Sequence, residues 1–370
     1  MRLLTVKGDD LAAIEAALQQ LLADEQVASI LMLLPSNNAF AATALDPMLL
    51  QAGKPVFGGI FAGVIHADQL QLHGAMLLGL PFAVAIAVIR QLNEEGGATL
   101  DSTLLDILPL KAESEQTLFT FVDGLSANIN QLILGLFNEF GLEINYIGGG
   151  CGGLSFERMP CVITPQGVLQ DAAVLALADC KCGVGVAHGW EPISGAFKVT
   201  EVDKNRIISL DWQPAFDVYR QVVEAHAGQR FKPSEFLALA KSYPFGIAKL
   251  AEEMVIRDPI SCDGGALTCV GEVRRGAYVH IMHGEPTTLI QAARHASRLA
   301  KRSFGAAAPQ MMLFVDCVSR YLFLQDQFDA ELKSVRTDLP MVGVLSLGEI
   351  ANCGQDYLEL FNKTAVVGLL

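Results

Sequence analysis

Residues 118–148 read LFTFVDGLSANINQLILGLFNEFGLEINYIG and predict a strand, a turn, a helix and a second strand. The apolar run at 118–122 has the length and the aromatic content of a buried strand. Residues 123–126 supply turn and N-cap side chains, and 127–140 carry apolar residues at helical spacing. Residues 144–148 then return to a strand pattern. The stretch therefore predicts one strand–helix–strand unit of an α/β protein.

The same order of elements occurs twice more along the chain. Residues 28–61 predict a strand, a helix and a strand, and residues 313–347 repeat that order. We expect a strand pair after each copy, over 74–89, 171–188 and 357–370. The sequence thus predicts an α/β fold of repeated strand–helix–strand–hairpin units. These units would form mixed sheets with helices packed on their faces, in two closely associated α/β domains.

A polar stretch at 228–233 (GQRFKP) is the predicted domain junction. We expect a helical lead-in over residues 1–26, a first domain with two internal repeats over 27–227, and a second domain over 228–370. The region around the junction also predicts a hairpin at 197–210 and helices at 214–227 and 286–301.

Composition excludes several classes of protein. Hydrophobic residues make up 51% of the 370 residues and charged residues 18%, with a net charge of −14, so the chain is neither disordered nor a general nucleic-acid binder. The longest apolar run, at 74–89, contains Pro81 and is shorter than the ~20 residues of a membrane helix. Acidic residues near the N-terminus argue against a signal peptide. We expect a cytoplasmic protein without a membrane segment.

Eight cysteines are present, and Cys180 and Cys182 form a C-x-C pair. In a cytoplasmic chain they are best interpreted as buried reduced thiols, with a metal or redox pair as the alternative.

The glycine-rich run at residues 148–153 (GGGCGG) follows a predicted strand. It contains G-x-G-x-x-G, but no helix pattern follows, so a dinucleotide site is disfavoured. A run of glycines, which have no side chains, permits either a tight bend or the close approach of a ligand or another segment. Under the ligand interpretation, the binding residues are Gly148, Gly149, Gly150 and Cys151.

His66 and His188 each follow a predicted strand of matching repeats, so we expect both to border one cavity. Each is either a structural histidine or a ligand, since a neutral imidazole at a strand end suits haem iron. No histidine pair has the spacing of another metal site.

Asp123 and Asp316 occupy what we interpret as equivalent turns before helices. They either cap those helices or bind a ligand amine. Arg320 lies one helical turn after Asp316 and either pairs with it or binds a carboxylate. No catalytic constellation stands out, so we expect a non-enzymatic protein.

Five short runs occur in a characteristic order: VFGGIFAG (56–63), YIGGGCGGLS (146–155), HGWEPI (188–193), GEI (348–350) and FNKT (361–364). Together they resemble the FIST family, named for F-box and intracellular signal transduction. The resemblance covers residues 27–370, with a FIST N-like first domain and a FIST C-like second domain. It implies a sensory module that binds small molecules, with amino acids often proposed.

Bacterial members of similar build include nitric-oxide-sensing haemoproteins that regulate a partner histidine kinase. The segment IISLDWQPAFDVY (207–219) resembles that group. The resemblance therefore implies a two-component sensor of gaseous nitric oxide that binds haem b. Our candidates for the iron ligand, His66 and His188, come from their placement after predicted strands and not from the family. Because the FIST-like region extends to residue 370, signalling would occur in trans, and a homodimer is compatible. The alternative is a non-haem sensor of an amino acid or similar metabolite, bound through the glycine run, Asp123, Trp190, Asp316 and Arg320.

Overall fold

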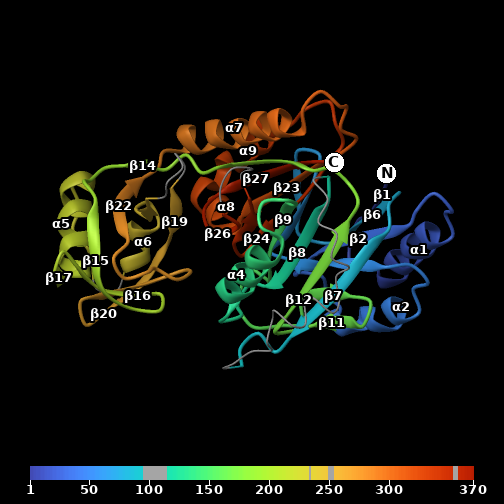
Figure 1. Ribbon diagram of the computed structural model, residues 1–370, viewed down its shortest axis with the longest axis horizontal. Coiled ribbons are helices and arrows are strands. Elements are labelled where there is room, and N and C mark those ends of the chain that lie inside the picture. Colours follow the sequence, from blue (N-terminus) through green and yellow to red (C-terminus); the bar gives the residue numbers. More distant parts are fainter. Residues whose placement is uncertain (95–114, 233–234, 249–253, 353–356) are drawn as a thin grey trace.

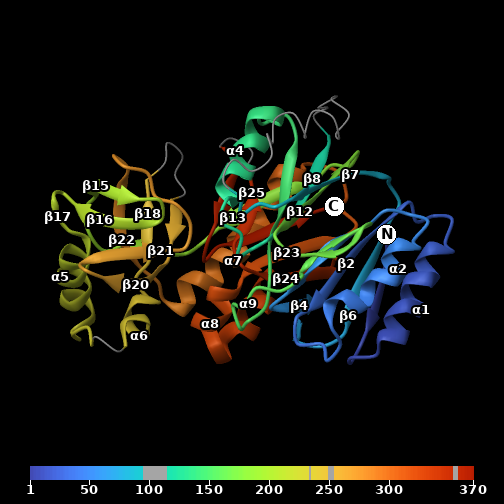
Figure 2. The same ribbon diagram turned by 90° about the horizontal axis from the view of Figure 1, so that it is seen from below.

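The computed structural model describes residues 1–94, 115–232, 235–248, 254–352 and 357–370 (Figure 1). Three six-stranded sheets form one body, called here the three-sheet unit, and a nine-stranded sheet forms a second. Figures 1 and 2 both show the nine-stranded sheet at one end of the molecule. None of the described helices is long and apolar enough to cross a membrane.

Each sheet of the three-sheet unit is built on one parallel strand pair, as the repeats predict. The side chains of these strands are buried almost throughout, so apolar residues occur on both faces. The pairs are β2 (Ser29–Pro35) with β3 (Val56–Phe61), β8 (Thr117–Asp123) with β9 (Asn145–Cys151), and β23 (Met312–Cys317) with β24 (Met341–Ser346).

The predicted strand pairs are present as strands, but the two members of each lie in different sheets. β6 (Ala75–Leu80) pairs with β2 and with β1 (Arg2–Val6), whereas β7 (Val84–Arg90) pairs with β12 (Ala172–Ala178) in the second sheet. β13 (Gly183–Ala187) and β27 (Ala365–Leu369) belong to the third sheet. In each of the three stretches the chain passes from one sheet to another between the two strands. The expectation that these strands form local hairpins is wrong.

True hairpins follow the second parallel strand of each repeat, and each one extends a sheet built by another repeat. β4 (Gly63–His66) with β5 (Gln69–Gln71) extends the third sheet, and β10 (Val162–Thr164) with β11 (Gly167–Leu169) extends the first. β25 (Glu349–Ala351) with β26 (Glu359–Phe361) extends the second sheet. This cyclic exchange ties the three repeats into one body.

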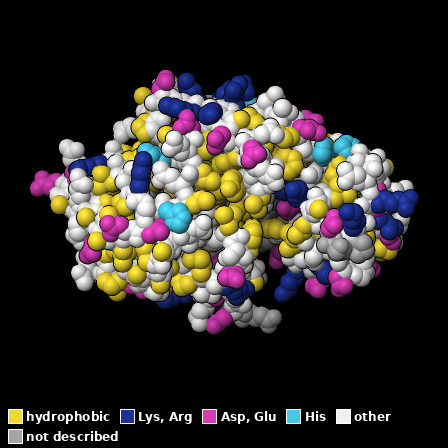
Figure 3. All heavy atoms as spheres, turned by 180° about the vertical axis from the view of Figure 1, so that it is seen from behind, with side chains coloured by type: hydrophobic (Ala, Val, Ile, Leu, Met, Phe, Trp, Pro, Cys, Tyr) yellow, Lys and Arg dark blue, Asp and Glu magenta, His cyan; other side chains and the backbone are white. Residues whose placement is uncertain are grey.

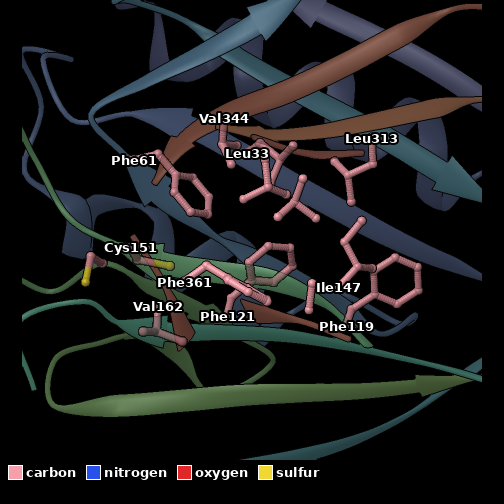
Figure 4. Packing of buried hydrophobic residues seen from close by; sticks show 14 of the residues in the cluster. Leu33, Phe61, Phe119, Phe121, Ile147, Cys151, Val162, Leu313, Val344 and Phe361 are labelled. Carbon is pink, nitrogen blue, oxygen red and sulfur yellow. The ribbon is translucent and has the colours of Figure 1, made fainter. Parts of the chain in front are cut away.

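The inner faces of the three sheets meet in a shared apolar core (Figure 4). The ring centroids of Phe57 and Phe119 lie 5.7 Å apart, and those of Phe61 and Phe121 lie 5.8 Å apart. Leu313 of the third sheet belongs to the same cluster. The excess of apolar residues in the sequence is thus largely accounted for by strands that are buried on both faces.

Helices pack on the outer faces of the sheets, at the predicted places. They are α1 (Leu11–Leu22) and α2 (Asp46–Leu50) with the 3₁₀ turn Ala42–Leu45 on the first sheet, α4 (Ile129–Phe140) on the second, and α7 (Pro286–Phe304), α8 (Val318–Leu324) and α9 (Phe328–Val335) with the 3₁₀ turn Gln325–Gln327 on the third.

The nine-stranded sheet and its helices occupy the chain between β13 and α7 and are called the inserted unit. The predicted hairpin is present as β15 and β16, and α5 follows it as expected. The predicted division at residue 228 stays a prediction. The elements are β14 (Glu191–Pro192), β15 (Phe197–Asp203), β16 (Arg206–Leu210), β17 (Gln213–Pro214), α5 (Ala215–Ala227), α6 (Phe236–Ala240), β18 (Phe245–Ile247), β19 (Val255–Arg257), β20 (Pro259–Asp263), β21 (Ala266–Cys269) and β22 (Tyr278–His283).

The chain enters the inserted unit through β14 and leaves it through β22. These two crossings pair as antiparallel strands, with Glu191 opposite His283 and Pro192 opposite Met282. We call this two-stranded connection the hinge ribbon. Both crossings between the two units therefore lie in this ribbon.

Candidate functional site

Charged side chains are buried where β23 and β24 end and the inserted unit begins. The carboxyl ends of parallel strands, at a change of topology, are a common place for ligand sites in α/β folds. Six such side chains form what we call the junction cluster. The Asp258 side chain is 13% exposed, and each of the other five is at most 1% exposed. The junction cluster comprises Asp316 (β23), Arg320 (α8), Glu331 (α9), Glu349 (β25), Lys363 (between β26 and β27) and Asp258 (between β19 and β20).

Arg320 forms the centre of the junction cluster. Its Nε lies 3.1 Å from Asp316 Oδ1 and also donates to Glu331 Oε1 at 3.1 Å. Nη1 donates to the His188 carbonyl at 2.6 Å, and Nη2 donates to the Leu289 carbonyl at 2.9 Å and to Glu331. One guanidinium therefore joins α8, α9, α7 and the end of β13.

Asp316 and Glu331 share that single guanidinium. Both Asp316 carboxylate oxygens and Glu331 Oε2 are buried without a hydrogen-bond partner among the described residues. Burial raises the pKa of both groups, and the proximity of Glu331 raises the pKa of Asp316 further. Two carboxylates so placed do not both ionise, so the pair holds a proton.

Burial also favours a proton on Glu349. Ser346 Oγ lies 2.6 Å from Glu349 Oε1 and 3.2 Å from the Asp316 carbonyl oxygen, which only accepts. A hydroxyl has one hydrogen, so when Ser346 donates to the carbonyl, Glu349 must be the donor in the shorter contact. Burial raises the pKa of Glu349 to about 8, in agreement with a neutral carboxyl at pH 7.

Lys363 connects the junction cluster to the inserted unit. Its Nζ lies 3.1 Å from Asp258 Oδ2 and donates to the Lys241 carbonyl at 3.0 Å. The same nitrogen lies 5.0 Å from the ring centroid of Trp190, whose Nε1 donates to the Lys363 carbonyl at 3.1 Å. These polar contacts between the two units lie beside apolar packing, in which Ile256 and Met282 of the inserted unit belong to the buried cluster of the third sheet and its helices.

The junction cluster contains more carboxyl groups than cations. Four carboxyl groups face the two cations Arg320 and Lys363. Buried charge without a counterion is costly, so protons on two of the carboxyl groups balance the two cations, and a cationic group can take the place of a proton. No group of three or more His, Cys, Asp or Glu side chains in the described part of the chain is arranged to hold a metal ion.

Two family models match the chain over most of its length. The FIST N domain matches residues 30–213, and the FIST C domain matches residues 215–352. The chain belongs to the FIST family. FIST domains are sensor domains of signal transduction. No curated protein matches the chain.

Four residues that the sequence nominated for the FIST site meet at the junction cluster. The His188 carbonyl contacts Arg320, and the Trp190 ring contacts Lys363. Asp316 pairs with Arg320, which was one of the two predicted roles of Arg320. His188 Nδ1 accepts the Trp190 backbone N–H at 2.9 Å. Burial, aided by the Arg320 charge, lowers the pKa of His188 to about 3, so this imidazole is neutral.

His66 lies away from the junction cluster. It stands at the end of β4, opposite Val342 at the start of β24, while Asp316 lies beside Leu345 near the other end. The two nominated histidines are therefore at opposite ends of the third sheet. The expectation that both border one cavity is wrong, because β4 extends the third sheet in the opposite direction to β24.

Asp123 and Asp316 are not equivalent positions. Asp123 is the last paired residue of β8, whereas Cys317 is the last paired residue of β23. Asp123 therefore corresponds to Cys317, one residue after Asp316. Because successive side chains of a strand point to opposite faces, Asp123 and Asp316 lie on opposite faces of their sheets. Asp123 accepts from the N–H groups of Leu125 at 3.1 Å and Asp171 at 2.8 Å, as a turn cap would. Asp316 makes no such cap, and the N-cap residue of α8 is Cys317.

The glycine run lies directly against the strand that carries Glu349. Gly149 pairs with Glu349, and the Gly150 N–H donates to the Gly348 carbonyl at 2.8 Å. Of the roles left open, the structure shows close approach by another segment. Cys151 is buried in the shared core, where desolvation raises the pKa of its thiol. Ligand binding by residues 148–151 stays a prediction.

Adding a methyl group at Gly149 is expected to disturb this contact. A Cβ there would lie 2.8 Å from the Gly348 carbonyl oxygen and 3.0 Å from Ser346 Cβ. We expect Gly149→Ala to lower the free energy of unfolding by about 1–3 kcal/mol in urea denaturation, as other overpacked sites do. Gly53→Ala is the control, because nothing lies within 4 Å of a Cβ at that position. Equal stabilities of the two variants would contradict the close approach.

The seven described cysteines are free thiols, and Cys353 lies outside the described residues. Burial raises the pKa of Cys180 to about 12 and raises that of Cys182 as well, which suits buried reduced thiols better than reactive ones.

Sequence reasoning missed four members of the junction cluster: Glu331, Glu349, Lys363 and Asp258. Glu349 and Lys363 stand in the GEI and FNKT runs, so the family resemblance contained a signal for them. The sequence around Glu331 and Asp258 does not predict that they are buried, because a charged residue on a helix or in a turn is usually exposed.

Proposed function

We propose that this FIST protein is a ligand-sensing signalling module whose two units are coupled through the junction cluster. The supporting observation is the buried excess of carboxyl groups at the contact between the units. A ligand that binds these groups favours one arrangement of the units over another by its differential affinity. The hinge ribbon supplies the element that can change.

A ligand that replaces a retained proton of the junction cluster carries an ammonium group, as an amino acid or a similar small metabolite does. Asp316 and Glu331 have buried oxygens without hydrogen-bond partners among the described residues, and an ammonium would satisfy them. Lys363, which pairs with Asp258 in this arrangement, is the cation that a ligand carboxylate would pair with in its place. Access requires the elements packed around these two carboxyl groups to move apart, because both groups are fully buried in this arrangement.

A thermal-shift screen with single amino acids tests this proposal. A ligand at one hundred times its Kd stabilises the protein by about 2.7 kcal/mol, and Tm rises accordingly. Glu331→Gln should abolish the response, whereas Glu157→Gln, at an exposed position, should retain it. A screen without any shift, or a response that persists in Glu331→Gln, would count against the junction cluster as the ligand site.

Haem-based sensing of nitric oxide is the second form of the proposal. His188 is neutral, as an iron ligand must be, but it is only 7% exposed and its Nδ1 already accepts a hydrogen bond. His66 is half-buried at the end of β4, two residues before Asp68, whose carboxylate pairs with the exposed Arg336. As arranged, neither residue fits a porphyrin, so a small polar ligand has the stronger support. If the wild-type protein shows a Soret band that is lost in His188→Ala or His66→Ala, haem has the stronger support instead.

The proposal extends to a signalling partner in trans, for which a histidine kinase is the candidate, and to the cytoplasm, where free cysteines persist. Acidic and basic side chains are interspersed on the face shown in Figure 3. The acidic net charge of −14 supports a protein or small-molecule partner over nucleic acid. Kinase autophosphorylation measured with and without this protein tests the partner, and light scattering tests for a homodimer.

A further inference from the structure

A hollow of about 650 Å³ lies on the inserted unit, away from the junction cluster. Its size is in the range of small-molecule sites. Ile193, Phe197, Val218 and Val222 give it apolar walls, and Asp211 and His226 add polar groups. The hollow is formed by α5 on one side and by the segment from β14 into β15 on the other.

The hollow borders both strands of the hinge ribbon. Ile193 follows β14 directly, and its backbone N–H donates to the Ile281 carbonyl of β22 at 2.9 Å. The ring of His226 lies 4.8 Å from the ring of His283, the last residue of β22. A molecule in the hollow would thus contact the chain segments that connect the two units.

A strained turn forms part of the rim. Leu210 of β16 pairs with Gln213 of β17, so Asp211 and Trp212 form a two-residue hairpin turn. Their φ angles are 47° and 66°, both in the left-handed region, which this turn type normally fills with Asn-Gly. Trp212 is 72% exposed. A bulky residue kept in a conformation that favours glycine, with its side chain in solvent, points to a functional role.

The polar groups of the hollow define the ligand chemistry. Among the residues that line it, Asp211 is the one carboxylate, and there is no Lys or Arg. Asp211 Oδ1 accepts the Lys198 backbone N–H at 3.1 Å, which leaves Oδ2 for a ligand. A carboxylate in a hollow lined by Phe197, with the exposed Trp212 next to it in the turn, suits an ammonium group with an apolar body. The lack of a cation in the lining disfavours carboxylate-bearing molecules, including amino acids.

We propose that this hollow binds small organic amines that lack a carboxylate, and that they act as effectors through the hinge ribbon. The site is separate from the junction cluster and does not depend on the ligand proposed there. Asp211 pairs with the ammonium group, Trp212 and Phe197 contact it through their ring faces, and Val218 and Val222 contact the apolar body.

Calorimetry with phenethylamine and phenylacetate tests the ligand class, since the two have similar bodies and opposite charges. We expect phenethylamine to bind at least about tenfold more tightly than phenylacetate, a difference of about 1.4 kcal/mol. Asp211→Asn should lower amine affinity by about tenfold while keeping the turn, because asparagine tolerates the left-handed region. Equal affinity for the two probes, no binding of phenethylamine, or unchanged binding in Asp211→Asn would overturn the proposal.

Trp212→Gly separates function from folding. Glycine relieves the strain of the turn, so we expect Tm to rise by about 2 °C while phenethylamine binding falls. Arg220→Ala is the control, because Arg220 lines another hollow of α5 and should leave amine binding unchanged. Glu331→Gln should also leave it unchanged, which distinguishes this site from the junction cluster. Full amine binding in Trp212→Gly, or its loss in Glu331→Gln, would overturn the assignment.

Discussion

Replacing Arg320 with methionine is expected to lower the free energy of unfolding by about 3–5 kcal/mol at pH 7, the usual effect of breaking a buried ion pair. Arg320 is fully buried and is the cation that Asp316 and Glu331 share. Its removal also leaves the carbonyls of His188 and Leu289 without this donor. Urea denaturation followed by circular dichroism measures the loss.

Arg336→Met provides the matched control. Arg336 pairs with Asp68 across 2.8 Å, but its side chain is 57% exposed, so its loss should change stability by less than about 1 kcal/mol. Adding Glu331→Gln to Arg320→Met should restore part of the stability, because it removes a carboxyl group that has lost its counterion. An Arg320→Met variant as stable as Arg336→Met would show that the junction cluster does not depend on the guanidinium.

The repeats could be predicted from the sequence because each carries its own local pattern. Strand, turn and helix signals recur at residues 28–61, 118–148 and 313–347, and the structure confirms a parallel pair in each. The exchange of hairpins could not be predicted. β4, β10 and β25 are three or four residues long, and a short buried strand does not encode which sheet it joins.

The candidate site shows a similar division between local and long-range information. Asp316 and Arg320 are candidate ligand-binding residues on the sequence alone, because they stand one helical turn apart. The face on which Asp316 lies was not predictable, because the matching FVD letters at 121–123 and 314–316 align one residue away from the structural register. Glu331 and Asp258 reach the cluster only through tertiary packing.

The two family segments do not coincide with the two units. The FIST N match ends at residue 213, inside β17, whereas strands of the inserted unit begin with β14 at Glu191. The FIST C match begins at residue 215 and includes both the rest of the inserted unit and β23 to β25 of the third sheet. Both segments therefore contribute to the junction between the units, and cutting the chain between them would divide the nine-stranded sheet.

Glu349→Gln is expected to change how stability depends on pH. The pKa of Glu349 is about 8 in the folded protein, above the ordinary glutamate value of 4.5. Between these values the folded state binds a proton that the unfolded state has released, so stability falls as pH rises from about 4.5 to 8. A glutamine is neutral throughout and keeps the amide where the protonated carboxyl stood. The variant should match the wild type near pH 5 and exceed it at pH 8.

The difference should grow by about 1.4 kcal/mol per pH unit across that window and then level off. Burial also raises the pKa values of Asp316 and Glu331 in both proteins, and because the Glu349 charge raises that of Asp316 further, its removal adds to the stability of the variant at high pH. Urea denaturation at pH 5, 6, 7, 8 and 9 measures the difference, with Glu157→Gln as the exposed control. Parallel curves for Glu349→Gln and the wild type would mean that Glu349 is ionised in the folded protein. In that case Ser346 donates to Glu349 rather than to the Asp316 carbonyl, and the junction cluster holds one proton fewer.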